Sequence, residues 1–225
     1  MKYIEKGDWP DWLTESYKKS VTEHKTPSEA FEMLSYEQKQ ELREILAGEQ
    51  SFECCYCMTK LDELDKDHVV IEHQFPRNPV GSEDRHQGLD YNNLFLSCNG
   101  ISGKGIYTCD KSKGNKVFKK LDLTDKKVMD TIYFKESNGT VHSEDTEVEE
   151  DIVDILNLND PYSSLYKRRF YGLATLEDAL VQVDDEEDRL ELALDYYAMY
   201  SDPEFLMDFK EMYLYILQEK LKDIL

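Results

Sequence analysis

The sequence is poor in basic residues: 27 Lys and Arg stand against 48 Asp and Glu, a net charge of −21 over 225 residues. A protein that binds nucleic acid on its own usually carries positive charge that neutralises phosphates. The composition therefore disfavours independent, high-affinity binding to nucleic acid. It still allows a local basic site, or a basic site that a partner protein contributes.

The sequence also lacks a long apolar segment. No run approaches the roughly 18 apolar residues that a membrane-spanning helix needs. The opening MKYIEKGDWP is charged and has no apolar stretch of a secretory signal. We therefore expect a cytoplasmic protein with no membrane contact. Apolar residues make up 40% of the chain and aromatics 12%, which suits one folded domain, or one domain with a helical extension.

An odd number of cysteines, five, argues against a disulfide framework, and all five lie between residues 54 and 109. Cys54 and Cys57 form a C-x-x-C pair, and Cys98 and Cys109 supply a second pair. Four thiolates complete the tetrahedral coordination of zinc and leave no open position, so the pattern predicts a structural zinc site. Cys55 could replace Cys54, but the two-residue spacing favours Cys54. A redox-active pair is disfavoured because no βαβ pattern surrounds it.

The first 50 residues have helical spacing and helix-capping signals. Thr26 precedes a proline at a first helical position. Ser35 and Gln38 form a capping-box pattern, and Gly48 is a natural end for the helix that Ser35 opens. We expect residues 1–50 to form an N-terminal helical segment.

The rest of the chain divides into two further regions. Residues 51–120 are rich in Gly, Asn, Cys, His and Lys, and their apolar run Val69-Val70-Ile71 predicts a buried strand. In residues 121–225, Asn138-Gly139 predicts a β-hairpin, and acidic helices follow. Residues 144–160 hold eight acidic side chains and no basic one. Such runs are usually solvated helix faces, and the alternative is a docking surface for a basic partner.

A further set of motifs lies between the two cysteine pairs and just after them. In order, the elements are Cys54-x-x-Cys57, Glu72-His73-x-x-Pro76, Asn93-Leu94, Cys98 and Cys109-Asp110-x-x-Lys113. This order resembles the HNH (ββα-metal) endonuclease family, in which Asp is commoner than Glu at the position of Glu72. The resemblance implies an α+β protein with a zinc-stabilised ββα-metal nuclease core over residues 51–120. The N-terminal helical segment flanks this core on one side, and a β-hairpin and acidic C-terminal helical region over residues 121–225 flank it on the other.

The residue types suit hydrolysis of a phosphodiester bond, which needs a base for water and a cation at the phosphate. His73 is the expected general base, and Glu72 and Asp110 offer oxygen ligands for a catalytic Mg²⁺ or Mn²⁺. Asn93 is expected to bridge the loop and orient His73. The helix expected after Cys109 carries positive charge. We expect it to bind phosphate through Lys111, Lys113, Asn115 and Lys116, with Lys119 and Lys120 beyond them.

A rival acid–histidine pair, Asp67-His68, precedes the strand instead of ending it, and no proline follows at the motif spacing. His73 is therefore favoured as the working histidine.

A narrower resemblance spans most of the chain. The opening MKYIEK, the Ile-Glu-His form of the motif, and Leu156-Asn157-Leu158-Asn159 with Leu165 and Arg168 are similar to the HNH subunit (PtuB) of Septu-type and retron-linked antiphage systems. This resemblance implies metal-dependent cleavage of DNA within a defence complex that contains an ABC-type ATPase subunit (PtuA). The net charge agrees with such a partner, and the C-terminal helical region is where we expect the contact.

Two alternatives remain open on the sequence alone. The substrate could be RNA, for instance tRNA, because ββα-metal sites contact the nucleic-acid backbone more than the bases. The chain could also be a non-catalytic zinc-binding adaptor whose acidic helices bind a basic partner.

Overall fold

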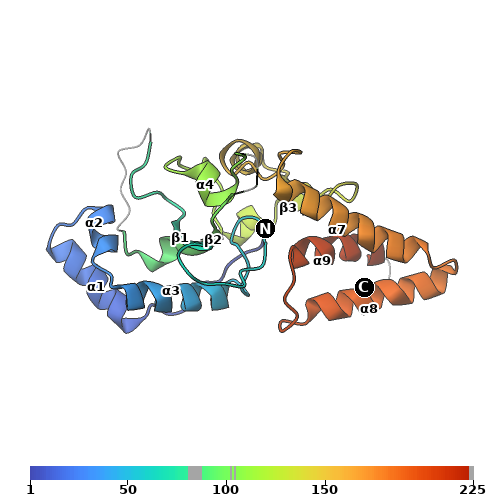
Figure 1. Ribbon diagram of the computed structural model, residues 1–225, viewed down its shortest axis with the longest axis horizontal. Coiled ribbons are helices and arrows are strands. Elements are labelled where there is room, and N and C mark those ends of the chain that lie inside the picture. Colours follow the sequence, from blue (N-terminus) through green and yellow to red (C-terminus); the bar gives the residue numbers. More distant parts are fainter. Residues whose placement is uncertain (81–87, 102, 104, 223–225) are drawn as a thin grey trace.

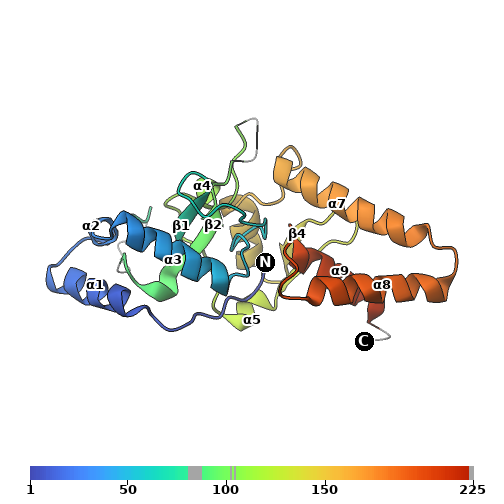
Figure 2. The ribbon, with the colours of Figure 1, turned by 60° about the horizontal axis from the view of Figure 1, so that its bottom comes forward.

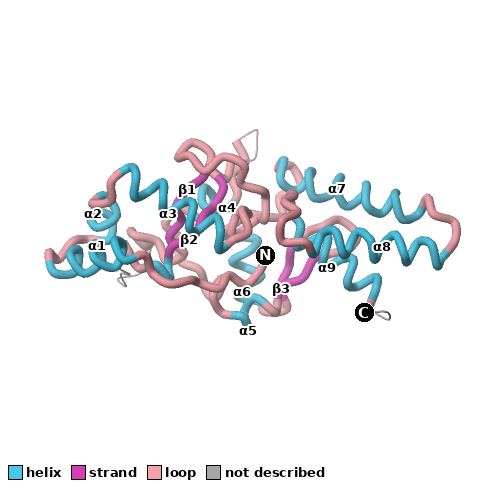
Figure 3. The backbone as a smooth tube through the Cα atoms, turned by 90° about the horizontal axis from the view of Figure 1, so that it is seen from below, coloured by secondary structure: helices cyan, strands magenta, loops and turns pink. Residues whose placement is uncertain are grey.

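The computed structural model describes residues 1–80, 88–101, 103 and 105–222. Helices occupy both ends of an elongated molecule, and a short antiparallel hairpin with its covering helix lies between them (Figure 1). Strands are few and short, and most of the regular structure is helical (Figure 3). The expected α+β class is therefore confirmed.

Three helices form the N-terminal end, and two begin at the predicted caps. They are α1 (Asp11–Thr22), α2 (Pro27–Glu32) and α3 (Tyr36–Glu49). Thr26 and Ser35 each accept a hydrogen bond from a backbone N–H of the first turn, and Glu29 and Gln38 bond back to the cap residues. Gly48 does not end α3, which continues to Glu49. The side chain of Gln50 then bonds both backbone groups of Leu96 and fastens α3 to the central hairpin.

The central hairpin pairs β1 (Val69–His73) with β2 (Leu94–Cys98), so the predicted strand is confirmed and extends two residues further. Val69 lies opposite Cys98 at one end, and His73 lies opposite Leu94 at the other. A short 3-10 helix, Tyr91–Asn93, precedes β2. The helix α4 (Cys109–Lys113) packs beside β2. The order strand, strand, helix agrees with a ββα arrangement, although α4 is only five residues long.

The predicted second hairpin is present and follows a short helix, α5 (Lys126–Met129). Its strands β3 (Ile132–Phe134) and β4 (Val141–Ser143) pair in antiparallel fashion around Asn138-Gly139. Next come α6 (Thr146–Glu150) and a π-helical turn, Asp151–Ile155.

One acidic residue of this segment is not on a solvated face. Asp151 is fully buried, and its carboxylate accepts hydrogen bonds from the backbone N–H groups of Lys119, Lys120 and Leu121 at 2.8–2.9 Å. The acidic composition of residues 144–160 therefore includes an internal structural anchor.

Three helices form the C-terminal end (Figure 2): α7 (Ser164–Val181), α8 (Glu186–Ser201) and α9 (Lys210–Leu221). This end contacts the core directly. The backbone N–H of Phe209 donates to the carbonyl of Met58, and Asp208 accepts from the backbone N–H of Lys60. Within the described ranges, no helix combines the length and the apolar character that crossing a bilayer demands.

Candidate functional site

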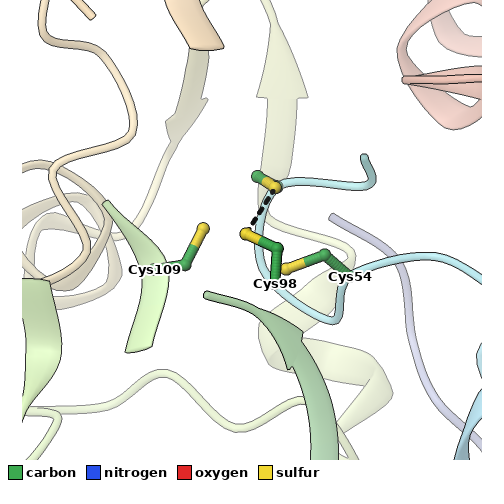
Figure 4. A group of neighbouring side chains, drawn as sticks. Cys54, Cys98 and Cys109 are labelled. Carbon is green, nitrogen blue, oxygen red and sulfur yellow. Dashed lines mark hydrogen bonds between the residues drawn. The ribbon is translucent and has the colours of Figure 1, made fainter. Parts of the chain in front are cut away.

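Four of the five cysteines meet in a cluster. The sulfurs of Cys54, Cys57, Cys98 and Cys109 all lie within 4.8 Å of one another, and we call them the four-cysteine cluster. Figure 4 shows the labelled Cys54, Cys98 and Cys109 with their sulfurs turned toward a common centre. All four are free thiols, and three of them are buried.

The spacing within the cluster fits zinc. Tetrahedral coordination at a zinc–sulfur distance of about 2.3 Å places neighbouring sulfurs about 3.8 Å apart. The Sγ atoms of Cys57 and Cys98 lie 3.8 Å apart, far beyond the roughly 2.0 Å of a disulfide. The cluster could therefore hold a metal such as zinc, with four sulfur ligands and no position left for a substrate.

Local backbone conformation brings the ligands together from three segments. In the first, the backbone N–H of Cys54 donates to the carbonyl of Thr59, the N–H of Met58 donates to the carbonyl of Cys54, and Met58 adopts a left-handed φ of 60°. Cys98 ends β2 and Cys109 begins α4. Cys55 is buried outside the cluster. The geometry therefore places Cys54, and not Cys55, among the four clustered cysteines.

Glu72 lies on β1 and is buried, 3% exposed. Its Oε1 accepts a hydrogen bond from the Tyr56 hydroxyl at 2.8 Å and contacts the Lys113 ammonium at 2.7 Å. Burial raises the pKa of Glu72 to about 8, the Lys113 charge opposes that rise, and the nearby Asp110 carboxylate adds to it. The structure thus brings Glu72 close to Asp110 and Lys113, which follow it in the sequence by 38 and 41 positions.

His73 projects to the other side of β1, as neighbouring strand residues do. It is 5% exposed and packs edge-on against Phe31 of α2, with ring centroids 5.0 Å apart. Its Nε2 lies 2.9 Å from the carbonyl oxygen of Gly88. Because a carbonyl only accepts, Nε2 must carry the proton, and the lone pair resides on Nδ1. Burial lowers the pKa of His73 to about 3, against the effect of the Gly88 carbonyl.

The side chain of Asn93 contacts the backbone of Phe75, two residues after His73. Its Oδ1 accepts from the Phe75 backbone N–H at 2.6 Å, and its Nδ2 donates to the Phe75 carbonyl at 2.9 Å. The backbone carbonyl of Asn93 also accepts from the N–H of Gln74. Asn93 therefore shapes the turn that follows His73.

The predicted phosphate-binding set is divided by the structure. Lys111, Asn115 and Lys116 are exposed on α4 and the turn after it. Lys113 is not on this surface: it is 1% exposed, and its ammonium contacts Glu72 and donates to the His73 carbonyl at 2.9 Å. Its expected role in a surface phosphate site is therefore corrected to a buried ion pair.

The lysines beyond α4 have acidic partners. Lys119 pairs with Glu150, and Lys120 pairs with Asp145 at 2.5 Å. The local positive charge near the hairpin is consequently smaller than the sequence suggests.

The rival histidine, His68, lies on the surface with different partners from those expected. Its Nδ1 lies 3.0 Å from Asp65 and 3.1 Å from Glu63. The hydrogen bond to Asp65 raises the pKa of His68. Glu63, Asp65 and His68 form a second group with possible ligand atoms, but such exposed groups are common without a metal.

The sequence did not predict the contacts of two buried side chains, Tyr56 and Arg169. Tyr56, within the C-x-x-C segment, bonds Glu72, and nothing in the sequence signals that contact. Arg169 is fully buried and contacts Leu158 and Asn159, whereas its neighbour Arg168 is exposed and pairs with Asp208. The arginine that holds the Leu-Asn-Leu-Asn segment is therefore the residue after the one that the resemblance singled out.

Comparison with known proteins identifies no relative: no protein-family model, no curated protein and no solved structure matches this chain.

Proposed function

We propose that the chain is a metal-dependent HNH endonuclease that hydrolyses phosphodiester bonds, with His73 as its general base. The observation that carries the proposal is the hydrogen bond from His73 Nε2 to the Gly88 carbonyl. This bond fixes the tautomer and aims an unprotonated Nδ1 away from Gly88, as a base for water requires. Burial keeps this nitrogen free of a proton at neutral pH, and the lowered pKa of His73 has to rise when substrate and ion bind for His73 to accept a proton from water.

The proposed catalytic ion is Mg²⁺ or Mn²⁺, with Glu72 and Asp110 as oxygen ligands. Bound there, it would polarise the phosphate and stabilise the leaving oxygen. Their proximity supports this assignment, since Asp110 lies near enough to raise the pKa of Glu72. Lys113 contributes the positive charge that Glu72 contacts through Oε1.

The charge of the chain supports a role as one subunit of an antiphage complex. With a net charge of −21, and with Lys119 and Lys120 already paired, the nuclease has little positive surface of its own. An ABC-type ATPase subunit, PtuA-like, would hold the nucleic acid or license cleavage. DNA is the preferred substrate in this proposal.

A second candidate, a zinc-binding adaptor, is favoured by one observation. Oε1 of Glu72 already has two internal partners, Tyr56 and Lys113, and the described residues contain no group of three acids or histidines around Glu72 that could hold an ion. In an adaptor, these residues would only stabilise the hairpin.

The test is cleavage of supercoiled plasmid and of total tRNA with Mg²⁺ or Mn²⁺, alone and with the candidate ATPase. We expect the wild type to cut and His73→Ala to lose cleavage by a factor of about 100 or more, the usual contribution of a general base. His142→Ala is the control, because His142 is a hydrogen-bonded, partly buried histidine that lies in the second hairpin, where it contacts Glu149. Equal cleavage by His73→Ala would refute the assignment of the base. No cleavage by the wild type, even with the ATPase present, would favour the adaptor.

A further inference from the structure

Arg169 is a fully buried arginine whose guanidinium is mostly unpaired. It lies on α7 and is 0% exposed. Its Nη2 donates to the Leu158 carbonyl and lies 3.3 Å from Oδ1 of Asn159. Its Nε and Nη1 have no hydrogen-bond partner among the described residues.

No carboxylate in the described part of the chain forms an ion pair with Arg169. Burying an ion without a counter-charge costs several kcal/mol. A side chain in this position therefore requires a negative group of another kind nearby.

The four-cysteine cluster lies beside this part of α7, because Cys57 and Cys98 line the same pocket as Leu165 and Arg168. A zinc ion with four thiolate ligands carries a net charge of −2. Burial lowers the pKa of Arg169 to about 10, and the groups that oppose this shift are Cys57, Cys109 and the Tyr166 hydroxyl. Both cysteines belong to the cluster.

The backbone explains why Arg169 lies near the cluster. The N–H of Cys109 donates to the carbonyl of Leu156 at 2.9 Å, which fixes the segment after the π-helical turn against a cluster cysteine. Arg169 reaches the same segment two residues later, at Leu158. One short stretch of chain thus contacts both a metal ligand and the buried arginine.

We propose that Arg169 supplies the buried counter-charge of a zinc tetrathiolate at the four-cysteine cluster, and that it thereby couples zinc binding to the docking of α7 on the core. Neutralising ligand charge from outside the coordination sphere strengthens metal binding. The inference depends on zinc in the cluster and is independent of nuclease activity. Zinc affinity and melting temperature therefore test it without a cleavage assay.

The test compares zinc affinity, measured by competition with a chromogenic chelator, in the wild type, Arg169→Gln and Arg168→Gln. Glutamine keeps a donor for the Leu158 carbonyl but removes the charge. We expect Arg169→Gln to bind zinc about 10- to 100-fold more weakly, the usual effect of losing an outer-shell partner. Arg168→Gln, which removes an exposed arginine paired with Asp208, should bind as tightly as the wild type. Unchanged zinc affinity in Arg169→Gln would overturn the inference.

Arg169→Lys keeps the test decisive if Arg169→Gln does not fold. Lysine retains the positive charge but not the planar donor set. We expect its zinc affinity to stay close to that of the wild type, and addition of zinc to raise its melting temperature. A loss of affinity of about tenfold or more in Arg169→Lys would show that shape, and not charge, explains the arginine, and would overturn the inference.

Discussion

At the scale of single residues, His68 and His73 differ in environment although they are only five positions apart in the sequence. His73 is buried against Phe31 and bonded to the Gly88 carbonyl, whereas His68 is exposed and bonded to Asp65. Burial disfavours a charged imidazole, and a neighbouring carboxylate favours it. The two pKa values should therefore move in opposite directions from the ordinary value of about 6.5.

An NMR titration of the histidine ring resonances measures this difference. His73 should show no titration between pH 5 and 8 and should remain protonated at Nε2, and the pKa of His68 should lie above its ordinary value. The stability effect has a definite sign. Below about pH 6.5 the unfolded chain binds a proton at His73 that the native chain does not, so stability falls on acidification. The drop in unfolding free energy from pH 7 to pH 5 should be smaller in His73→Gln than in the wild type. Titration of His73 near pH 6.5 would contradict its burial.

Two lysines show what the sequence alone does not predict. Lys111 and Lys113 were grouped as one phosphate-binding surface, but residues two apart on a helix do not share a face. The structure accordingly exposes Lys111 and buries Lys113 against Glu72. Which lysine faces inward depends on how α4 packs on the hairpin, and no local signal in the sequence specifies that packing.

At the scale of elements, the sequence predicts helix caps and tight turns correctly because these depend on contacts between residues that are close in the chain. Caps at Thr26 and Ser35 and the turn at Asn138-Gly139 satisfy backbone groups with nearby atoms, and all three appear as expected. The π-helical turn Asp151–Ile155 was not predicted, since it depends on a contact between distant segments. Asp151 holds that contact by accepting three backbone N–H groups of residues 119–121.

Replacing Asp151 tests this anchor. Asp151→Asn substitutes an amide donor for one carboxylate oxygen, which leaves buried N–H groups without an acceptor. We expect a loss of about 2–4 kcal/mol in unfolding free energy, as for hydrogen bonds to a buried charged group. Asp154→Asn, three residues along and exposed, should change stability by less than about 0.5 kcal/mol. Urea denaturation compares the two variants, and equal effects would show that Asp151 is not an anchor.

At the scale of the whole molecule, the four-cysteine cluster connects elements that are far apart in the chain. Its ligands come from the turn after α3, the end of β2 and the start of α4. The C-x-x-C spacing and the clustering of cysteines predicted this centre, because metal chemistry dictates ligand type and number. The role of the C-terminal helices could not be predicted in the same way. Arg169 and the contact of Phe209 with Met58 arise only when the chain has folded.

The proposed nuclease site also spans several elements, and α4 joins it to the metal cluster. Cys109 begins this helix at the cluster, and Lys113 ends it at Glu72 and the His73 carbonyl. Metal binding should therefore fix the position of Asp110 and Lys113 relative to β1. We therefore predict that zinc is required for the fold, for the proposed activity and for the role of Arg169.

Zinc content is therefore the first quantity to measure, by native mass spectrometry of the purified chain. The melting temperature of the same chain is measured with and without a strong chelator. We predict one zinc ion per chain in the wild type and in Cys55→Ser, which changes a buried cysteine outside the cluster. Cys109→Ser should lose the ion, and chelation should unfold the wild-type core, because binding energy at such sites is folding energy. A wild-type chain that contains no zinc and melts at the same temperature with or without the chelator would contradict the zinc centre.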